Sequence, residues 1–144
     1  MEPSTRPRCR NDPRTRVLGA LVDGDADAHR KATEIDELRV PARVPTAVVW
    51  EAYTGIGNVA SDRTADQLRG LYERLLATRP IVDLTPEVSR HAGEVNGKHR
   101  QSDSLSELDG ADSIVAAHGL HRDEPVVSND RDFRDVEGLS VVTY

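Results

Sequence analysis

Three acidic side chains stand in unusual places in this sequence. Glu51 lies inside an apolar stretch, Asp112 opens the apolar segment ADSIVAAHGL, and Asp130 follows the apolar run PVVS. Carboxylates that gather in a half-buried place repel one another and lose hydration unless a cation joins them. Mg²⁺ suits such a site, because it is a hard ion that takes one or two carboxylates and completes its shell with water and phosphate. These residues therefore predict a divalent metal site that acts on phosphodiesters.

Each of these acids also has a plain structural interpretation. Asp112, with Asp109 three residues before it, fits the start of a helix, whose positive end favours carboxylates. Glu51 fits the solvent-facing side of its helix, and Asp130 in the segment SNDRD fits a turn. From spacing alone, both interpretations stay open for each residue.

Histidine and glycine motifs add little to this picture. His118 and His121 are three residues apart, but no cysteine or third histidine joins them at the spacing of a zinc site, which favours a buried or capping histidine. The sequence contains no phosphate-binding loop, nucleophile elbow or dinucleotide-binding glycine motif. The candidate chemistry therefore rests on the carboxylates.

The composition is that of one small domain. With 144 residues, the chain is long enough for a single hydrophobic core. The net charge is −6, so RNA contacts would come from local arginines or from a metal rather than from a basic surface. Cys9 is the only cysteine, which excludes an internal disulfide, and neither a long apolar span nor a secretory signal occurs. We therefore expect a cytoplasmic protein that does not enter membranes.

The sequence pattern changes at residue 17. Residues 1–16 hold three prolines, five arginines and almost no apolar side chain, which predicts a disordered tail. Residues 17–144 form the predicted domain, in which short apolar strands alternate with helices. This alternation is typical of a three-layer α/β fold with a mainly parallel central sheet. The predicted helices are 17–22, 26–38, 46–57, 62–77, 86–99 and 111–120, and the predicted strands are 81–84, 125–128 and the C-terminal LSVVTY.

Three segments, in this order, resemble the PIN domain family, and in particular the VapC toxins of type II toxin–antitoxin pairs. They are VPTAVVWEAYTGIGN, LDGADSIVAAHGL and EPVVSNDRDFRDVEGLSVV, and the last forty residues or so carry the most specific part. The resemblance implies a central parallel sheet flanked by helices and an endoribonuclease activity that depends on Mg²⁺ or Mn²⁺. It also implies an RNA substrate, a homodimer and a cognate VapB-like antitoxin.

The resemblance implies roles for individual residues as well. Glu51 matches the acidic residue of an early helix, Asp112 the aspartate before the apolar helix, and Asp130 the last acidic position. In the family these three positions are catalytic and hold the metal. Asp132 matches a neighbouring carboxylate that can help or replace Asp130. Ser128 stands where the family has Thr or Ser, in reach of the substrate phosphate.

The chain departs from the family pattern at its first strand. In the family an apolar strand ends in Asp-Thr or Asp-Ser, and this Asp is a principal metal ligand. When VLGALVDGD is matched to the family's first helix, Arg14 falls at that position and no apolar strand precedes it. Asp12 lies two residues earlier, but Pro13 argues against a central strand there. We therefore expect the first strand to be lost, either because the tail stems from a wrong start or frame or because the chain is catalytically degenerate.

The sequence leads to two alternative functions. One is a metal-dependent endoribonuclease of the VapC toxin type, impaired by loss of the first metal-binding aspartate. The other is a catalytically inactive PIN-like module that binds an antitoxin or another protein. A receiver-like phosphoacceptor domain is disfavoured, because paired acids should follow its first strand.

Overall fold

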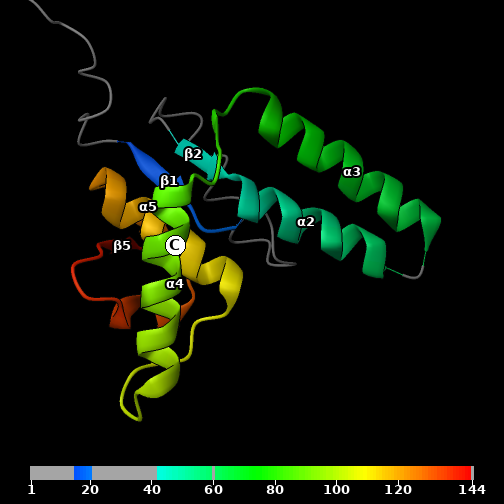
Figure 1. The fold of residues 1–144 in the computed structure, drawn as a ribbon. Coiled ribbons are helices and arrows are strands. Elements are labelled where there is room, and N and C mark those ends of the chain that lie inside the picture. Colours follow the sequence, from blue (N-terminus) through cyan, green and yellow to red (C-terminus); the bar gives the residue numbers. More distant parts are fainter. Residues whose placement is uncertain (1–14, 21–41, 60, 144) are drawn as a thin grey trace, which may run out of the picture.

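The computed structural model describes residues 15–20, 42–59 and 61–143. Its centre is a five-stranded sheet in the order β3-β2-β1-β4-β5, and all neighbouring strands are parallel (Figure 1). Parallel neighbours need crossover connections, which helices commonly supply. The predicted α/β fold with a parallel central sheet flanked by helices is therefore confirmed. The strands are β1 (Arg16–Leu18), β2 (Ala42–Pro45), β3 (Ile81–Val82), β4 (Val126–Val127) and β5 (Val141–Val142).

The central place in the sheet belongs to β1. Val17 pairs with Arg43 of β2 on one side and with Val126 of β4 on the other. Two predictions are therefore wrong: the first strand is not lost, and Val17 and Leu18 belong to a strand rather than to a helix. Both side chains are buried, as in a strand that is covered on both faces. An apolar run this short fits either element, so its spacing could not distinguish them.

Most of the other predicted elements are present. The predicted helices 46–57, 62–77, 86–99 and 111–120 are confirmed, as are strands within 81–84, 125–128 and the C-terminal segment. Residues 1–14, the remainder of the predicted helix 17–22 beyond Ala20, and the predicted helix 26–38 lie outside the described residues. The helical elements are α2 (Thr46–Asn58), α3 (Asp62–Ala77), α4 (Pro86–Gln101), α5 (Gly110–Arg122) and the short 3-10 helix η2 (Arg131–Asp135).

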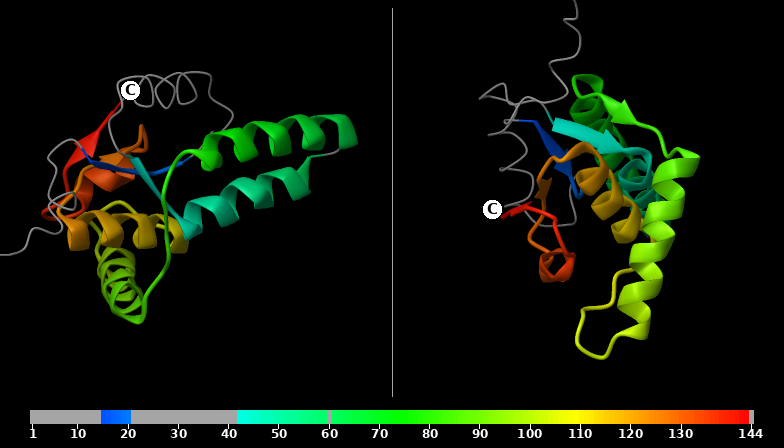
Figure 2. Two further views of the ribbon diagram at one scale, coloured as in Figure 1. Left: turned by 90° about the horizontal axis from the view of Figure 1, so that it is seen from above. Right: turned by 60° about the vertical axis from the view of Figure 1, so that its left-hand side comes forward.

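The helix α5 lies next to the sheet. It packs against β1 and β4, and α2 contacts both β2 and α5. The helix α4 packs on α5, while α2 and α3 run side by side as an antiparallel pair (Figure 2). Because α5 is covered on several sides, its apolar residues are buried nearly all round, as its sequence predicted. Among the described residues, no helix has the length and apolar character to span a membrane.

The two histidines of α5 have different surroundings. His118 is buried, its Nε2 has no hydrogen-bond partner among the described residues, and burial, followed by the charges of Arg122 and His121, lowers its pKa to about 4. His121 lies with its Nε2 3.5 Å from a carboxylate oxygen of Glu87 on α4. The interpretation of His118 as a buried histidine is therefore confirmed.

An ion pair connects the two strands that flank β1. Arg43 of β2 donates from Nε to both carboxylate oxygens of Glu124, each at 3.1 Å. Glu124 lies just before β4, so the pair joins the two neighbours of the central strand. The Glu124 side chain is only 3% exposed, so without the guanidinium group it would be a buried and unpaired charge.

Candidate metal centre

Three carboxylates converge where α2 meets the start of α5. They belong to Glu51, Asp109 and Asp112, and one ligand oxygen from each lies within 4.8 Å of the others. Glu51 is in the second turn of α2, which packs on α5. Asp109 is the N-cap of α5, where it accepts a hydrogen bond from the backbone N–H of Asp112 at 2.8 Å. Helix packing thus brings together acids that are far apart in the sequence.

Burial and mutual repulsion make this cluster unfavourable when no cation is bound. The pKa of Glu51 is raised, first by burial and then by the charge of Asp109. The pKa of Asp112 is raised to about 7, first by burial and then by the negative charges of Asp109, Glu51, Asp130 and Asp132. A raised pKa means that ionising the carboxyl group costs free energy in the folded protein, and a bound cation would remove this cost.

Two aspartates that follow β4 act on this cluster through their charges. Ser128 is buried, and its Oγ accepts a hydrogen bond from the backbone N–H of Asp130 at 2.9 Å. Asp130 caps η2, because its Oδ1 accepts from the backbone N–H of Asp132 at 2.9 Å. Both aspartates raise the pKa of Asp112, but neither belongs to the group of three described acids whose oxygens lie within 4.8 Å. Their roles as metal ligands, and that of Ser128 as a substrate contact, stay predictions.

Asp109 is the member of the cluster that the sequence did not single out as a ligand. The plain interpretation of Asp112 in the sequence was the start of a helix, with Asp109 before it, and the structure makes Asp109 the N-cap of that helix. The cap bond uses one carboxylate oxygen, Oδ1, so the same side chain can still offer an oxygen to a cation. The signal was the segment DGAD, which places two carboxylates at one helix end.

The position directly after the central strand carries no side chain. β1 ends at Leu18, and the next residue is Gly19, whose N–H donates to the carbonyl oxygen of Val127 at 2.9 Å. In the structure the residue after the first strand is therefore Gly19, while Arg14 lies outside the described residues, so the alignment of Arg14 with the family's first aspartate stays a prediction. A Cβ at Gly19 would lie 2.9 Å from that carbonyl oxygen and 3.1 Å from the Cβ of Ser128. The neighbouring strand leaves no room for a side chain here.

Replacing Gly19 with alanine is expected to destabilise the protein. The added methyl group must displace the backbone of β4, and overpacking of this kind costs about 1–3 kcal/mol. Urea unfolding followed by circular dichroism measures the change. Gly93→Ala on α4 is the matched control. No atom of the described residues lies within 4 Å of a Cβ at this position, so the variant should stabilise the helix by about 1 kcal/mol. An unchanged or raised urea midpoint for Gly19→Ala would contradict the packing described for β1 and β4.

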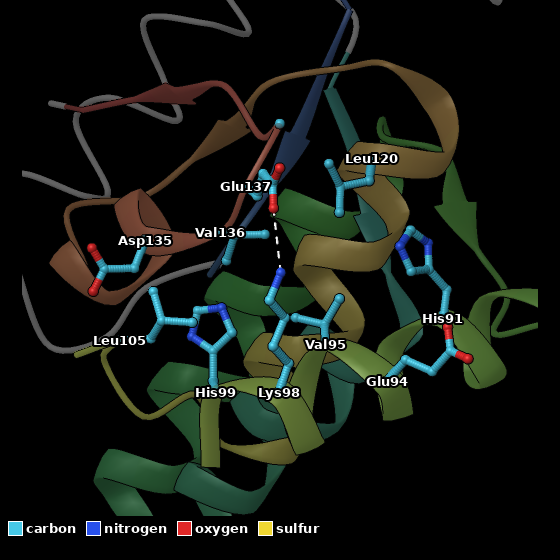
Figure 3. Close-up of a pocket in the computed structure, with 11 residues that line it drawn as sticks. His91, Glu94, Val95, Lys98, His99, Leu105, Leu120, Asp135, Val136 and Glu137 are labelled. Carbon is cyan, nitrogen blue, oxygen red and sulfur yellow. Dashed lines mark hydrogen bonds and ion pairs between the residues drawn. The ribbon is translucent and has the colours of Figure 1, made fainter. Parts of the chain in front are cut away.

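A separate cavity of about 570 Å³ lies between α4 and the turn that precedes β5 (Figure 3). Lys98 and Glu137 form an ion pair at 3.3 Å at this cavity. None of the three converging carboxylates lines it, so the cavity is not part of the candidate centre. Its apolar lining comes from Val95, Leu105, Leu120 and Val136.

The donor set fits a hard divalent cation. All three groups are carboxylates, with no cysteine or histidine among them, and oxygen ligands favour Mg²⁺, Mn²⁺ and Ca²⁺ over softer metals. The raised pKa values of Asp112 and Glu51 point the same way, since they reflect first the burial of the carboxylates and then the negative charges around them. The three carboxylates can therefore hold a metal ion together.

Comparisons with known proteins agree with this fold. Among solved structures, VapBC2 from Rickettsia felis bound to a DNA fragment from its promoter matches with a TM-score of 0.71 and 14% identity, over 90% of this chain and 98% of that one. VapBC-5 from Mycobacterium tuberculosis matches with a TM-score of 0.65 and 18% identity, over 91% and 98%. At these identities the matches establish a shared fold. A search of curated proteins gives no match. The PIN domain family matches residues 15–139, which is most of the chain. This chain therefore belongs to the PIN domain family.

Proposed function

We propose that the protein is a metal-dependent endoribonuclease of the VapC toxin type. The observation that carries this proposal is the convergence of Glu51, Asp109 and Asp112 at the junction of α2 and α5 in a PIN domain. Carboxylates at this spacing with raised pKa values are suited to a divalent cation. The fold shared with VapBC proteins supports the toxin type.

The acids and Ser128 would have different roles at such a site. Glu51, Asp109 and Asp112 would hold Mg²⁺ or Mn²⁺, which supplies Lewis-acid chemistry at an RNA phosphodiester. Ser128 accepts the N–H of Asp130 at its Oγ, which leaves its hydroxyl proton to donate to a phosphate oxygen. The cap bond to η2 fixes the Asp130 carboxylate close to Asp112, where it can orient the attacking water or bind the same or a second cation. The proposed partners are an RNA substrate, a VapB-like antitoxin and a second copy of the chain, in the cytoplasm.

Gly19 favours a second candidate, a catalytically inactive PIN module that binds an antitoxin or another protein. The family places a principal metal-binding aspartate after its first strand, whereas this chain has a glycine there, with no space for a side chain. The two candidates differ in one property, which is RNA cleavage.

An RNA cleavage assay with the purified protein distinguishes the candidates. We expect cleavage with Mg²⁺ or Mn²⁺, none with EDTA, and a loss of at least about a hundredfold in Glu51→Gln, since a metal contributes several kcal/mol to such reactions. Glu73→Gln, at an exposed position on α3, should cleave like the wild type. If the wild type binds an antitoxin but cleaves no RNA with either metal, the binding module is the correct candidate.

A further inference from the structure

A side chain on α4 reaches the backbone that carries two of the three converging acids. Asn96 donates from Nδ2 to the carbonyl oxygen of Leu108 at 2.7 Å and to Oγ of Ser113 at 3.2 Å. Ser113 in turn donates from Oγ to the carbonyl oxygen of Asp109 at 2.9 Å. One amide group thus connects α4 to the loop before α5 and to the first turn of that helix.

These hydrogen bonds bracket the acidic segment in sequence. Leu108 immediately precedes Asp109, and Ser113 immediately follows Asp112. Leu108 and Ser113 are each 1% exposed, so water cannot easily replace the bonds that Asn96 makes to them. The amide therefore fixes both ends of the short segment whose side chains face Glu51.

The segment needs such a restraint, because the acids repel one another. One carboxylate oxygen from each of Glu51, Asp109 and Asp112 lies within 4.8 Å of the others, so like charges at this distance repel and relaxation of the backbone would separate them. The packing of α4 on α5 provides a rigid support from which Asn96 can resist that separation. Side chains that orient metal ligands in this way commonly change metal affinity 10–100-fold when they are replaced.

We infer that Asn96 is a positioning residue of the metal centre. It holds residues 108–113 so that Asp109 and Asp112 stay within reach of one cation together with Glu51, and it does not itself contact the metal or the RNA. This inference rests on the proposed function for its metal, but not on RNA cleavage.

The test is the affinity of the full-length protein for Mn²⁺, measured by isothermal titration calorimetry and by the spin-resonance signal of free Mn²⁺. Asn96→Asp keeps the shape but replaces the donor by an acceptor that faces the Leu108 carbonyl oxygen, and Asn96→Ala removes both bonds. We expect both variants to bind Mn²⁺ about 10–100-fold more weakly than the wild type. Gln101→Glu makes the same change from amide to carboxylate at an exposed site on the same helix and should bind normally.

Two further measurements separate positioning from a general loss of stability. The Mn²⁺ concentration that half-activates RNA cleavage should rise in Asn96→Ala, while the rate at saturating Mn²⁺ recovers toward the wild-type rate. Ser113→Ala should weaken Mn²⁺ binding as well, and the double variant should lose less than the sum of the two single changes, because both residues belong to one chain of hydrogen bonds.

Two results would overturn the inference. One is that folded Asn96→Ala binds Mn²⁺ as tightly as the wild type does, and the other is that the wild type binds no Mn²⁺. Should Asn96→Asp fail to fold, Asn96→Ala and Ser113→Ala decide the question. A wild type that binds Mn²⁺ but cleaves no RNA contradicts the proposed function alone, and weaker binding by Asn96→Ala would then still support the positioning role.

Discussion

Replacing Asp112 with asparagine is expected to abolish metal binding and RNA cleavage while making the metal-free protein more stable. The pKa of Asp112 is raised to about 7 by burial and by its acidic neighbours, so its charge opposes folding. One pKa unit corresponds to about 1.4 kcal/mol, and screening at this partly open site reduces the total, so we expect a gain of roughly 2 kcal/mol. Thermal unfolding in EDTA should show a midpoint roughly 5 °C higher.

The gain should depend on pH in a defined direction. When the pKa of a carboxyl group is higher in the folded than in the unfolded protein, the folded state binds more protons at pH values between the two pKa values. The wild type therefore loses stability as the pH rises from about 4 to about 7, the interval between the ordinary pKa of 3.8 and the raised value. The advantage of Asp112→Asn should be greatest above pH 7 and disappear near pH 4.

Asp62→Asn is the matched control, since Asp62 also lies in the first turn of a helix but outside the acidic cluster. At an ordinary helix start, loss of the carboxylate costs about 0.3–1 kcal/mol, so this variant should melt slightly earlier. Added Mn²⁺ should raise the unfolding midpoint of the wild type and leave that of Asp112→Asn unchanged. A lower midpoint for Asp112→Asn in EDTA at pH 8 would show that the cluster is not under electrostatic strain.

Replacing Arg43 with alanine is expected to cause a large loss of stability. The substitution leaves the Glu124 carboxylate buried without its partner, and removal of one member of a buried pair costs about 3–5 kcal/mol. The unfolding midpoint should fall by roughly 10 °C, as measured by calorimetry. The pair joins the neighbours of the central strand, so amide exchange in β1 and β4 should accelerate in the same variant.

Two variants show whether this loss comes from the buried charge. Arg69→Ala removes an exposed pair with Asp66 and should cost less than about 1 kcal/mol. The double variant Arg43→Met/Glu124→Leu removes both charges and should recover much of the stability lost in Arg43→Ala. If the double variant is as unstable as Arg43→Ala, the guanidinium group stabilises the fold by packing rather than by neutralising Glu124.

Part of the candidate centre could be predicted because its residues are of the wrong type for their surroundings. Glu51 interrupts an apolar run and Asp112 opens an apolar helix, and the structure brings both into the cluster. Asp109 was not predicted as a metal ligand, because a carboxylate at the start of a helix already has a structural explanation. Whether α2 would approach α5 depends on packing between distant segments, which sequence spacing does not encode.

The fold was predicted better than its central strand. Helices α2 to α5 are long enough for their apolar periodicity to be recognised, whereas β1 has three residues and no period to measure. The segment β1 is a strand because its backbone pairs with β2 on one side and with β4 on the other. Both partner strands are remote from β1 in the sequence. Because β1 was predicted as part of a helix, the residue that follows it, Gly19, was not considered as a position at the sheet's edge.

The tight approach of Gly19 to β4 limits which residues position 19 can accept. Any side chain there first meets the Val127 carbonyl oxygen and the Ser128 side chain. An acid could enter this position only together with a rearrangement of β4, and a variant with the acid alone should be less stable than the wild type. Changes that adjust the acidic cluster are therefore expected first among the acids that α2 and α5 carry.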